Sequence, residues 1–324
     1  MRILQSRTNI DFVGKRWMFF AFSGFMILGS AVSVATKGLV YGIDFTGGTV
    51  LQVTMAKPIT LGELREKVEE SGIPDASIQS YSGTNTFSIR IKADAANSAG
   101  AMEAMKVSIQ KALGDNAMRV DSQEYVGPTV GKHLFRQAMW AVILSLTGIV
   151  IYIAFQFSDP VWGLAGVIAL GHDVFTTVGL FSIAGSEVDL LIISALLTIA
   201  GYSINDTIVI FDRMREKMRT ARTLPMDQLI NESINECLSR TIITNGLVFV
   251  AVVILFLFGG KVIHNFAMAM VWGAIAGTYS TIAIATPMVY EWQVRTRRRP
   301  QAAPAKPLNI SSKAPQKKPG TRPA

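Results

Sequence analysis

The chain has little of what disulfide or metal chemistry requires. Among 324 residues there are one cysteine, Cys237, and three histidines. A single cysteine excludes an internal disulfide framework, and its helical spacing from Ile230 and Ile234 indicates packing rather than reactivity. There is no cluster of histidine and cysteine, no phosphate-binding loop and no nucleophile–base pair. We therefore expect no metal, no cofactor and no enzyme activity.

Charge is also scarce. Charged residues make up 17% of the chain, against about 25% in an ordinary soluble domain, whereas half of the residues are hydrophobic. This composition excludes a disordered chain, a collagen and a coiled coil, and it argues against a soluble enzyme. The net charge is +8, but it is unevenly placed. Residues 37–136 carry 11 basic and 11 acidic side chains, whereas residues 137–211 carry five charges, all acidic. This segregation indicates a membrane protein with one sizeable extramembrane domain.

Six segments are long and apolar enough to cross a bilayer, which takes about 20 residues. They are residues 17–36, 137–157, 160–183, 188–211, 241–260 and 265–290. No cleavage pattern follows the first, so we expect an uncleaved anchor rather than a signal peptide.

The distribution of lysine and arginine near the spans predicts the orientation. Four lie in residues 1–16, six in the connection 212–240 and nine in residues 291–324, whereas the connection 184–189 has two acids and no base. Both termini and the 212–240 connection are therefore expected in the cytoplasm, and the 37–136 block outside. We expect residues 225–238, which are amphipathic, to lie along the cytoplasmic interface. The basic tail, 291–324, is expected to be disordered, to record topology and to contact anionic lipid, with no specific nucleic-acid partner.

The outer block predicts an α+β domain. Residues 49–55 alternate as in a strand, Thr60 and Glu63 form a capping box that starts a helix ending near Gly72, and residues 76–81 and 86–91 read as two strands. A second helix, 99–113, and a final strand, 118–126, complete the order β-α-β-β-α-β of a ferredoxin-like fold. This fold serves many purposes and does not assign a function.

Two acids stand inside predicted spans, where ionisable groups are costly and often functional. Asp173 lies about 18 Å into its span and Asp206 about 10 Å from the cytoplasmic end, at 1.5 Å per residue. Asn205 is a neighbouring hydrogen-bonding group, and Arg240 is a candidate partner for either acid. Proton relay is one interpretation, and a static brace between helices is the other. An intramembrane aspartyl protease is disfavoured, because the G-x-G-D pattern of that class is absent around Asp173.

Several motifs appear in one order along residues 5–295. They are Tyr41-Gly-Ile-Asp44-Phe-Thr-Gly47-Gly48-Thr, Val126-Gly-Pro-x-Val-Gly131, Gly171-His-Asp173-Val, Gly201-Tyr-Ser-Ile-Asn205-Asp206-Thr, Phe211-Asp-Arg213 and Ser239-Arg240-Thr241. Together they resemble the SecF branch of the SecD/SecF family, part of the RND superfamily.

The resemblance implies an α-helical integral membrane protein, a six-helix bundle like half an RND transporter, with a periplasmic domain. It implies a place in the bacterial inner membrane beside SecD, assisting the SecYEG channel and the SecA motor, with YajC and YidC as further partners. Such a pair uses the proton-motive force to help exported polypeptide emerge. The positions of Asp206 and Arg240 then belong to the proton path, with Asp173 a secondary candidate.

Other interpretations stay open. An RND-like half-transporter for a small molecule would need a polar, substrate-sized pocket, and a passive scaffold would need no proton coupling. Gly47 and Gly48 are expected to form a tight turn that joins the outer domain to the first span, either as a hinge or as a fixed structural element. In the last span, Gly273 and Gly277 form a close-approach motif.

Overall fold

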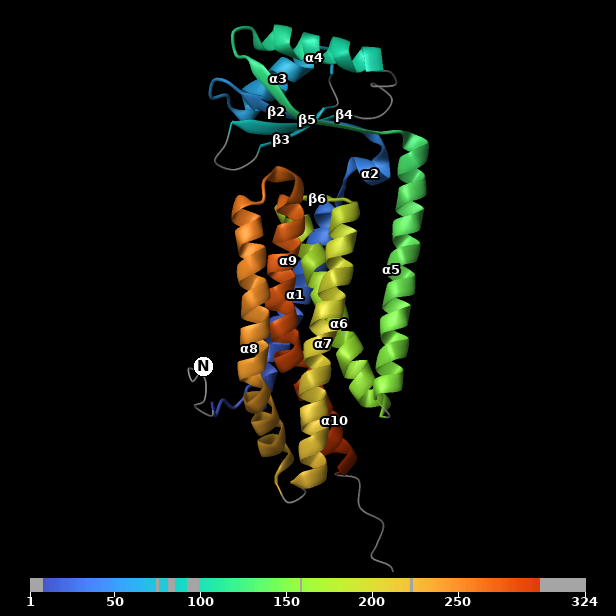
Figure 1. The fold of residues 1–324 in the computed structure, drawn as a ribbon, viewed down its shortest axis with the longest axis vertical. Coiled ribbons are helices and arrows are strands. Elements are labelled where there is room, and N and C mark those ends of the chain that lie inside the picture. The colour runs from blue at the N-terminus through green and yellow to red at the C-terminus, as the bar shows by residue number, and fades with distance from the viewer. Residues whose placement is uncertain are drawn as a thin grey trace, which may run out of the picture.

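The computed structural model describes residues 8–73, 76–80, 85–91, 99–157, 159–221 and 224–297. A bundle of long helices carries an α/β domain at one end (Figure 1). Within the described part, six helical stretches are long and apolar enough to span a membrane. The chain is thus a multi-pass membrane protein of the predicted class.

One helix of the bundle precedes the α/β domain in the chain, and the others follow it. The bundle helices are α1 (Arg16–Lys37), α5 (Pro128–Gln156), α6 (Pro160–Ala184), α7 (Leu190–Thr220), α8 (Met226–Phe258), and α9 (Lys261–Ser280), which continues through a π-helical turn (Thr281–Ala285) into α10 (Thr286–Arg297). The π turn adds a residue to one turn of helix, a feature that often accompanies functional sites.

Several helices are longer than the predicted spans. Helix α5 begins at Pro128, nine residues before the predicted span, because proline suits the first helical position and Gly127 precedes it in extended conformation. Helix α7 continues to Thr220, and α8 begins directly after Pro225. Residues 225–238, expected along the interface, therefore form the first part of α8, and they pack against the end of α7. The tail beyond residue 297 lies outside the described residues.

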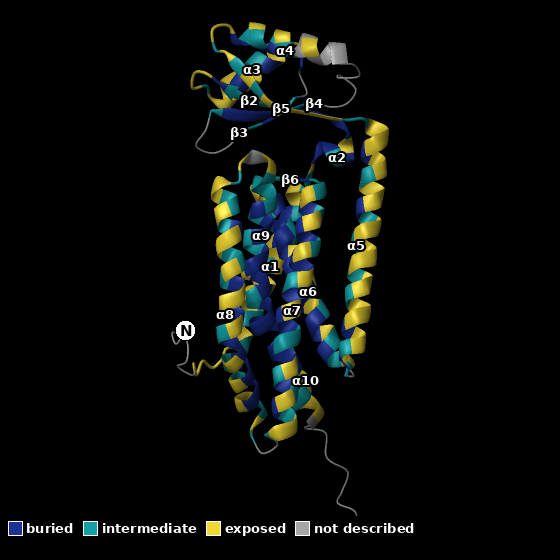
Figure 2. Ribbon diagram, viewed as in Figure 1, coloured by how far each residue is buried: buried dark blue, intermediate teal, exposed yellow. Residues whose placement is uncertain are grey.

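Burial separates central from peripheral helices (Figure 2). In the most apolar windows of α6, α7 and the last helical stretch, 50%, 50% and 61% of residues are buried, against 17%, 11% and 17% in α1, α5 and α8. The central helices also contain most of the buried polar side chains of the bundle. Polar residues thus lie where the protein, rather than lipid, surrounds them.

The α/β domain has the predicted topology. Its elements are β2 (Gly48–Met55), α3 (Leu61–Glu70), β3 (Ser77–Ser80), β4 (Thr86–Ile91), α4 (Ala99–Leu113) and β5 (Met118–Val126). The strands form an antiparallel sheet in the order β3-β4-β2-β5, which is the ferredoxin-like arrangement. The capping box of Thr60 and Glu63 is present. Residues 81–84, where we expected a strand end and a turn, lie outside the described residues.

Helices α3 and α4 cover one face of this sheet, and its other face looks toward the bundle (Figure 1). The core between sheet and helices includes Leu51, Val53, Leu64, Ile89 and Ile109, each with no exposed surface. The charged and polar surface of the domain therefore encloses an independent apolar core.

Gly47 and Gly48 form a turn in the connection between the first membrane helix and the α/β domain. It lies between the short helix α2 (Ile43–Thr46) and β2, with φ of +71° at Gly47 and +138° at Gly48. A Cβ on Gly47 would lie 2.8 Å from the Cα of Pro128. The turn therefore packs against the start of α5, the second membrane helix, and not against α1.

A two-stranded parallel pair links the domain to the bundle. Strand β1 (Val40–Tyr41), which follows α1, pairs with β6 (Glu187–Val188), which lies between α6 and α7. The Asp44 Oδ2 atom accepts a hydrogen bond from the backbone N–H of Leu190 at 3.1 Å. Asp44 therefore caps the start of α7, because the first N–H groups of a helix lack partners within the helix.

Candidate functional site

Asp206 lies on the buried side of α7, and its residue is 6% exposed. The Asn245 Nδ2 atom on α8 donates a hydrogen bond to Asp206 Oδ2 at 2.6 Å. The same Nδ2 atom lies 2.6 Å from Thr278 Oγ1 on α9, and Asn245 Oδ1 accepts a hydrogen bond from the hydroxyl of Tyr202. Asn245 thus links Asp206 to Tyr202 on the same helix and to Thr278 on α9.

Asn205, which we expected beside Asp206, does not take part in this cluster. Its side chain is exposed, and none of the hydrogen bonds found in the described chain involves it. Successive residues on a helix project about 100° apart, since 3.6 residues make a turn. When Asp206 faces α8, Asn205 therefore faces outward, and the two side chains form no hydrogen bond with each other in the described chain.

Asn245 is the residue that sequence reasoning missed. It lies in a segment read as uniformly apolar, five residues after Arg240 and 39 residues after Asp206. The available signal was a polar amide near the start of a membrane span, where unpaired polar groups are costly.

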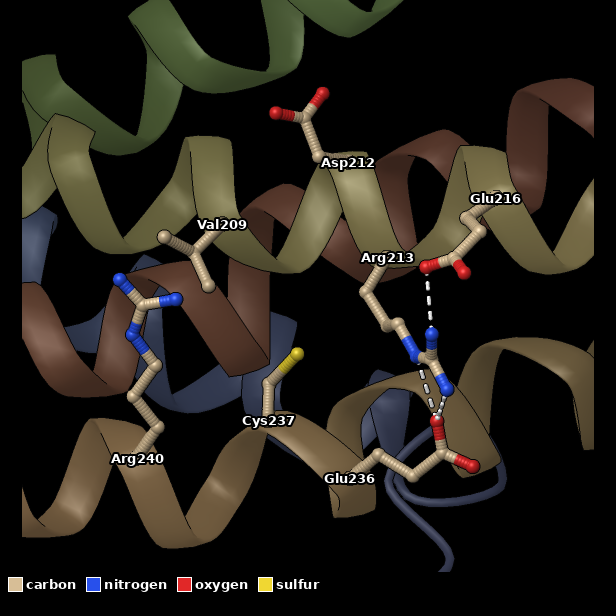
Figure 3. Close-up of a pocket in the computed structure, with 7 residues that line it drawn as sticks. All are labelled: Val209, Asp212, Arg213, Glu216, Glu236, Cys237 and Arg240. Carbon is tan, nitrogen blue, oxygen red and sulfur yellow. Dashed lines mark hydrogen bonds and ion pairs between the residues drawn. The ribbon is translucent and has the colours of Figure 1, made fainter.

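Arg240 lines a cavity of about 490 Å³ between α7 and α8 (Figure 3). Its guanidinium group lies beside Val209, one helical turn after Asp206 on α7. Three residues of helix rise by about 4.5 Å, so Val209 places this end of the cavity about one helical turn from Asp206. Among the described residues Arg240 forms no ion pair within 4 Å, so it makes no direct contact of that kind with Asp206.

The part of this cavity nearest the α7–α8 connection is charged. The Arg213 guanidinium bonds to Glu216 at 2.5 Å and to Glu236 at 2.5 Å, and Lys217 Nζ bonds to Glu232 at 2.6 Å and to Glu236 at 2.8 Å. Burial opposes the charge of Glu236, but hydrogen bonds from Lys217 and Arg213 outweigh it and lower the pKa of that carboxyl. These pairs hold the ends of α7 and α8 together.

Cys237 lies in the same cavity wall, and its thiol points into the space between α7 and α8 (Figure 3). The residue is 9% exposed and belongs to the apolar cluster with Ile230 and Ile234. Burial raises the pKa of its thiol, which leaves less of the reactive thiolate at neutral pH. The packing role predicted for Cys237 is confirmed.

Asp173 lies in a second, separate network. Its side chain is fully buried on α6, and Oδ2 accepts hydrogen bonds from Ser203 Oγ on α7 at 2.6 Å and from Ser280 Oγ on α9 at 2.7 Å. Its Oδ1 lies 3.0 Å from Nδ1 of His172. Arg240 takes no part among these contacts, so the sequence-based option of an Asp173–Arg240 pair is not realised.

The close-approach glycines explain how α9 comes near α7. A Cβ on Gly273 would lie 2.3 Å from the Ile199 side chain, and one on Gly277 would lie 3.1 Å from Ser203 Cβ. Both glycines therefore face α7 beside the two polar networks. Across the described chain, no group of three or more His, Cys, Asp or Glu side chains is placed to hold a metal ion.

Comparison with known proteins agrees with this architecture. Residues 105–295 match the family described as "Protein export membrane protein SecD/SecF, C-terminal", and residues 32–59 match the "SecD/SecF GG Motif". The protein translocase subunit SecF of Endomicrobium trichonymphae is 40% identical over 300 residues, which cover 92% of this chain and 96% of that protein. The subunit of the same name from Vibrio alginolyticus is 38% identical, over 88% of this chain and 90% of that protein.

Solved structures agree as well. The crystal structure of SecDF, a translocon-associated membrane protein from Thermus thermophilus, superposes with a TM-score of 0.82 at 34% identity, covering 91% of this chain and 40% of that one. SecDF in a super-membrane-facing form gives a TM-score of 0.66 at 35% identity, over 90% of this chain and 39% of the other. The chain therefore belongs to the SecF family of protein translocase subunits.

Proposed function

We propose that this subunit works with a SecD-type partner and uses the proton-motive force to promote export of polypeptides through the Sec machinery. One observation carries the proposal. Asp206, a buried acid, lies among three helices, held by Asn245, one helical turn from a cavity lined by the cation Arg240. An ionisable group at this depth is costly to maintain and marks a proton or ion pathway by default.

The proposed chemistry uses residues of this chain. An ionised Asp206 attracts Arg240, and a protonated Asp206 does not, so proton uptake at a carboxylate oxygen weakens the hold of α7 on α8. Asn245 Nδ2 keeps the carboxyl oriented toward α8 in either state. Loading and unloading of one proton therefore changes the attraction between two helices, and Asp44 and the β1–β6 pair connect this helix pair to the outer domain.

The exposed face of α7 supports a second membrane subunit. Ser194, Thr198, Gly201 and Asn205 recur at intervals of three or four residues and are all exposed. Small and polar side chains of this kind are favoured between packed membrane helices and disfavoured against lipid. We propose that SecD covers this face, and that the SecYEG channel and SecA motor, with YajC and YidC, are the wider partners.

We further propose the bacterial inner membrane as the location, with both termini cytoplasmic. The basic connection between α7 and α8 lies at the end of the bundle opposite the α/β domain (Figure 1). The positive-inside rule then assigns that end to the cytoplasm and the α/β domain to the periplasm, where it is free to contact emerging polypeptide.

The small-molecule alternative has weaker support. A cavity of about 480 Å³ between α1, α8 and α9 is lined mostly by apolar side chains, and its polar groups are the Asn245 amide and the hydroxyls of Thr278 and Tyr279. This lining differs from the polar, substrate-sized pocket that a half-transporter of that kind requires.

The proposal is tested with Asp206→Asn, whose amide keeps the shape of the side chain but does not carry the titratable proton. In inverted membrane vesicles that contain the SecD-type partner, we expect this variant to lose the stimulation of polypeptide export by a proton gradient while ATP-driven export remains. Asp227→Asn, an exposed acid at the start of α8, is the control and should retain the stimulation. Full stimulation in Asp206→Asn would refute the proton role. Failure to co-purify with a SecD-type subunit would refute the partnership.

A further inference from the structure

Asp173 is a fully buried acid that lies outside the Asp206 cluster, yet it touches the same helices. We propose that Asp173 is a positioning residue. Through Ser203 and Ser280 it fixes the turns of α7 and α9 on which the Asp206 site is built, and it acts by accepting hydrogen bonds rather than by carrying a proton. The inference rests on the proposed function in one respect: the site that Asp173 positions is the one at which Asp206 is proposed to carry the proton.

The two serines tie Asp173 to both halves of the Asp206 site. Ser203 precedes Asp206 by one helical turn on α7, so a hydrogen bond at Ser203 sets the height and rotation of Asp206. Ser280 follows Thr278 by two residues on α9, and Thr278 contacts the Asn245 amide that holds Asp206. A single oxygen, Asp173 Oδ2, accepts from both serines at 2.6 and 2.7 Å. One atom thus sets the spacing of α7 and α9 from α6.

His172 explains the orientation of the carboxyl group. Its ring is 2% exposed, its Nδ1 lies 3.0 Å from Asp173 Oδ1, and its Nε2 has no hydrogen-bond partner among the described residues. A protonated imidazole would bury an N–H group at Nε2 without an acceptor, which is costly. The neutral ring with its proton on Nδ1 satisfies the geometry, and it turns Oδ2 toward the two serines.

The place of Ser280 adds to the effect. It is the last residue of α9 before the π-helical turn Thr281–Ala285, where the regular helical hydrogen bonds change register. Tyr279, next to it, reaches α1, because its hydroxyl donates to the Phe19 carbonyl at 2.8 Å. The Asp173 bond therefore holds α9 at the point where its geometry is irregular.

A positioning role and a carrier role predict opposite results for one substitution. In Asp173→Asn, the amide oxygen takes the place of Oδ2 and accepts from both serines. The amide nitrogen takes the place of Oδ1 beside His172 Nδ1, where a hydrogen bond would require the imidazole proton to move to the unpartnered Nε2. The two serine bonds, on which the positioning role rests, survive without a titratable group. Asp173→Ala removes both serine bonds.

The experiment measures proton-gradient-stimulated export in vesicles with the full chain and its partner. We expect Asp173→Asn to stay within about twofold of the parent. Asp173→Ala should fall at least about tenfold, because it leaves the buried Ser203 hydroxyl without a partner and releases Ser280 to its remaining acceptor, the Gly277 carbonyl. The matched control is Thr177→Val on the same helix. In the described chain the Thr177 hydroxyl makes one hydrogen bond, to the backbone carbonyl of Asp173 at 2.7 Å, and none to the serines. The variant should keep full activity.

A second readout does not depend on activity. The hydroxyls of Thr207 on α7 and of Thr281, the first residue of the π-helical turn that follows α9, lie 2.9 Å apart. In a Cys237→Ala background, Thr207→Cys combined with Thr281→Cys reports the spacing of these helices by the rate of disulfide formation. We expect Asp173→Ala to slow this cross-link severalfold and Asp173→Asn to leave it unchanged.

The results separate the two proposals. An Asp173→Asn variant that cross-links normally but loses stimulation as completely as Asp206→Asn would overturn the inference in favour of a proton carrier. Unchanged cross-linking and activity in Asp173→Ala would overturn it as well. If Asp206→Asn keeps its stimulation, the proton role fails, while the cross-link rates still decide whether Asp173 sets the spacing of α7 and α9.

Discussion

Replacing Gly47 by alanine tests how the α/β domain is joined to the membrane helices. Gly47 has a φ of +71°, and a Cβ at this position would lie 2.8 Å from Pro128 Cα and 3.1 Å from Pro128 N. Both neighbours are backbone atoms, so no rotation of a side chain relieves the contact. From the other side, a Cβ on Gly131 would lie 2.9 Å from the Gly47 nitrogen. The turn and the first turn of α5 therefore leave no room for a methyl group.

Two contributions set the magnitude. Gly47 has a φ of +71° and a ψ of 157°, a conformation that costs a residue with a Cβ about 1–3 kcal/mol, and forcing a methyl group into a packed site costs about 1–3 kcal/mol. We expect Gly47→Ala to lower the free energy of unfolding the junction by about 2–6 kcal/mol from these two sources. A loss of this size is a large part of the stability of a typical domain, about 5–15 kcal/mol.

Gly38→Ala is the matched control. Gly38 has a nearly identical φ of +72°, but a Cβ at this position would meet no heavy atom within 4 Å, so the variant reports the backbone strain alone. Hydrogen exchange of β2 and of the first turn of α5, followed by mass spectrometry, measures the opening free energy of the junction. The steric contribution should make exchange in Gly47→Ala about 5–150 times faster than in Gly38→Ala. Equal exchange in the two variants would refute the close packing of the turn against Pro128.

Two further predictions concern the contacts between helices. Gly273→Ala should weaken the packing of α9 on α7 and lower the thermal stability of the protein, because its Cβ would meet Ile199 at 2.3 Å. All three contacting atoms, Cγ1, Cδ1 and Cγ2, belong to Ile199, so the double variant with Ile199→Ala should lose less stability than the sum of the two single variants. Simple additivity in thermal unfolding in detergent would contradict the contact. Because Lys217 and Arg213 lower the pKa of Glu236, their ion pairs stabilise the α7–α8 ends above the ordinary Glu pKa and are lost as pH falls through the lowered value. Spin labels on the exposed tips of these helices should therefore separate in acid in the parent. The pH dependence should be smaller in Glu236→Gln, which keeps the Lys217–Glu232 pair. A parent distance that stays constant well below the ordinary Glu pKa of about 4.3 would argue against these ion pairs.

Much of the architecture followed from local sequence patterns. Runs of apolar residues located six helices, and the alternation of residues 49–55 with the capping box at Thr60 located the sheet and its first helix. These features depend on neighbours in the chain, so the sequence records them directly. The predicted helix ends were less accurate at the end of the bundle opposite the α/β domain, because α7 and α8 continue past the apolar stretch as a charged pair of helices.

The candidate site was harder to predict because it depends on partners far apart in sequence. Asp206 and Asp173 stood out as isolated acids in apolar segments. Their hydrogen-bond partners, Asn245 for Asp206 and Ser280 for Asp173, lie 39 and 107 residues away. Only the relative rotation of packed helices decides such pairs, and the same rotation turns Asn205 outward.

The docking of the outer domain on the bundle has a consequence for synthesis of the protein. The described apolar core of the domain is built from residues 51–120, so its residues are all available as soon as that stretch has been synthesised. The contacts between the domain's connection and the bundle form later in synthesis, because β1 pairs with residues 187–188 and Asp44 caps α7 at Leu190. Domains generally fold in the order in which the ribosome delivers them. The domain therefore folds first as an independent body on a single anchor, and it seats on the bundle only after α6 and α7 have entered the membrane.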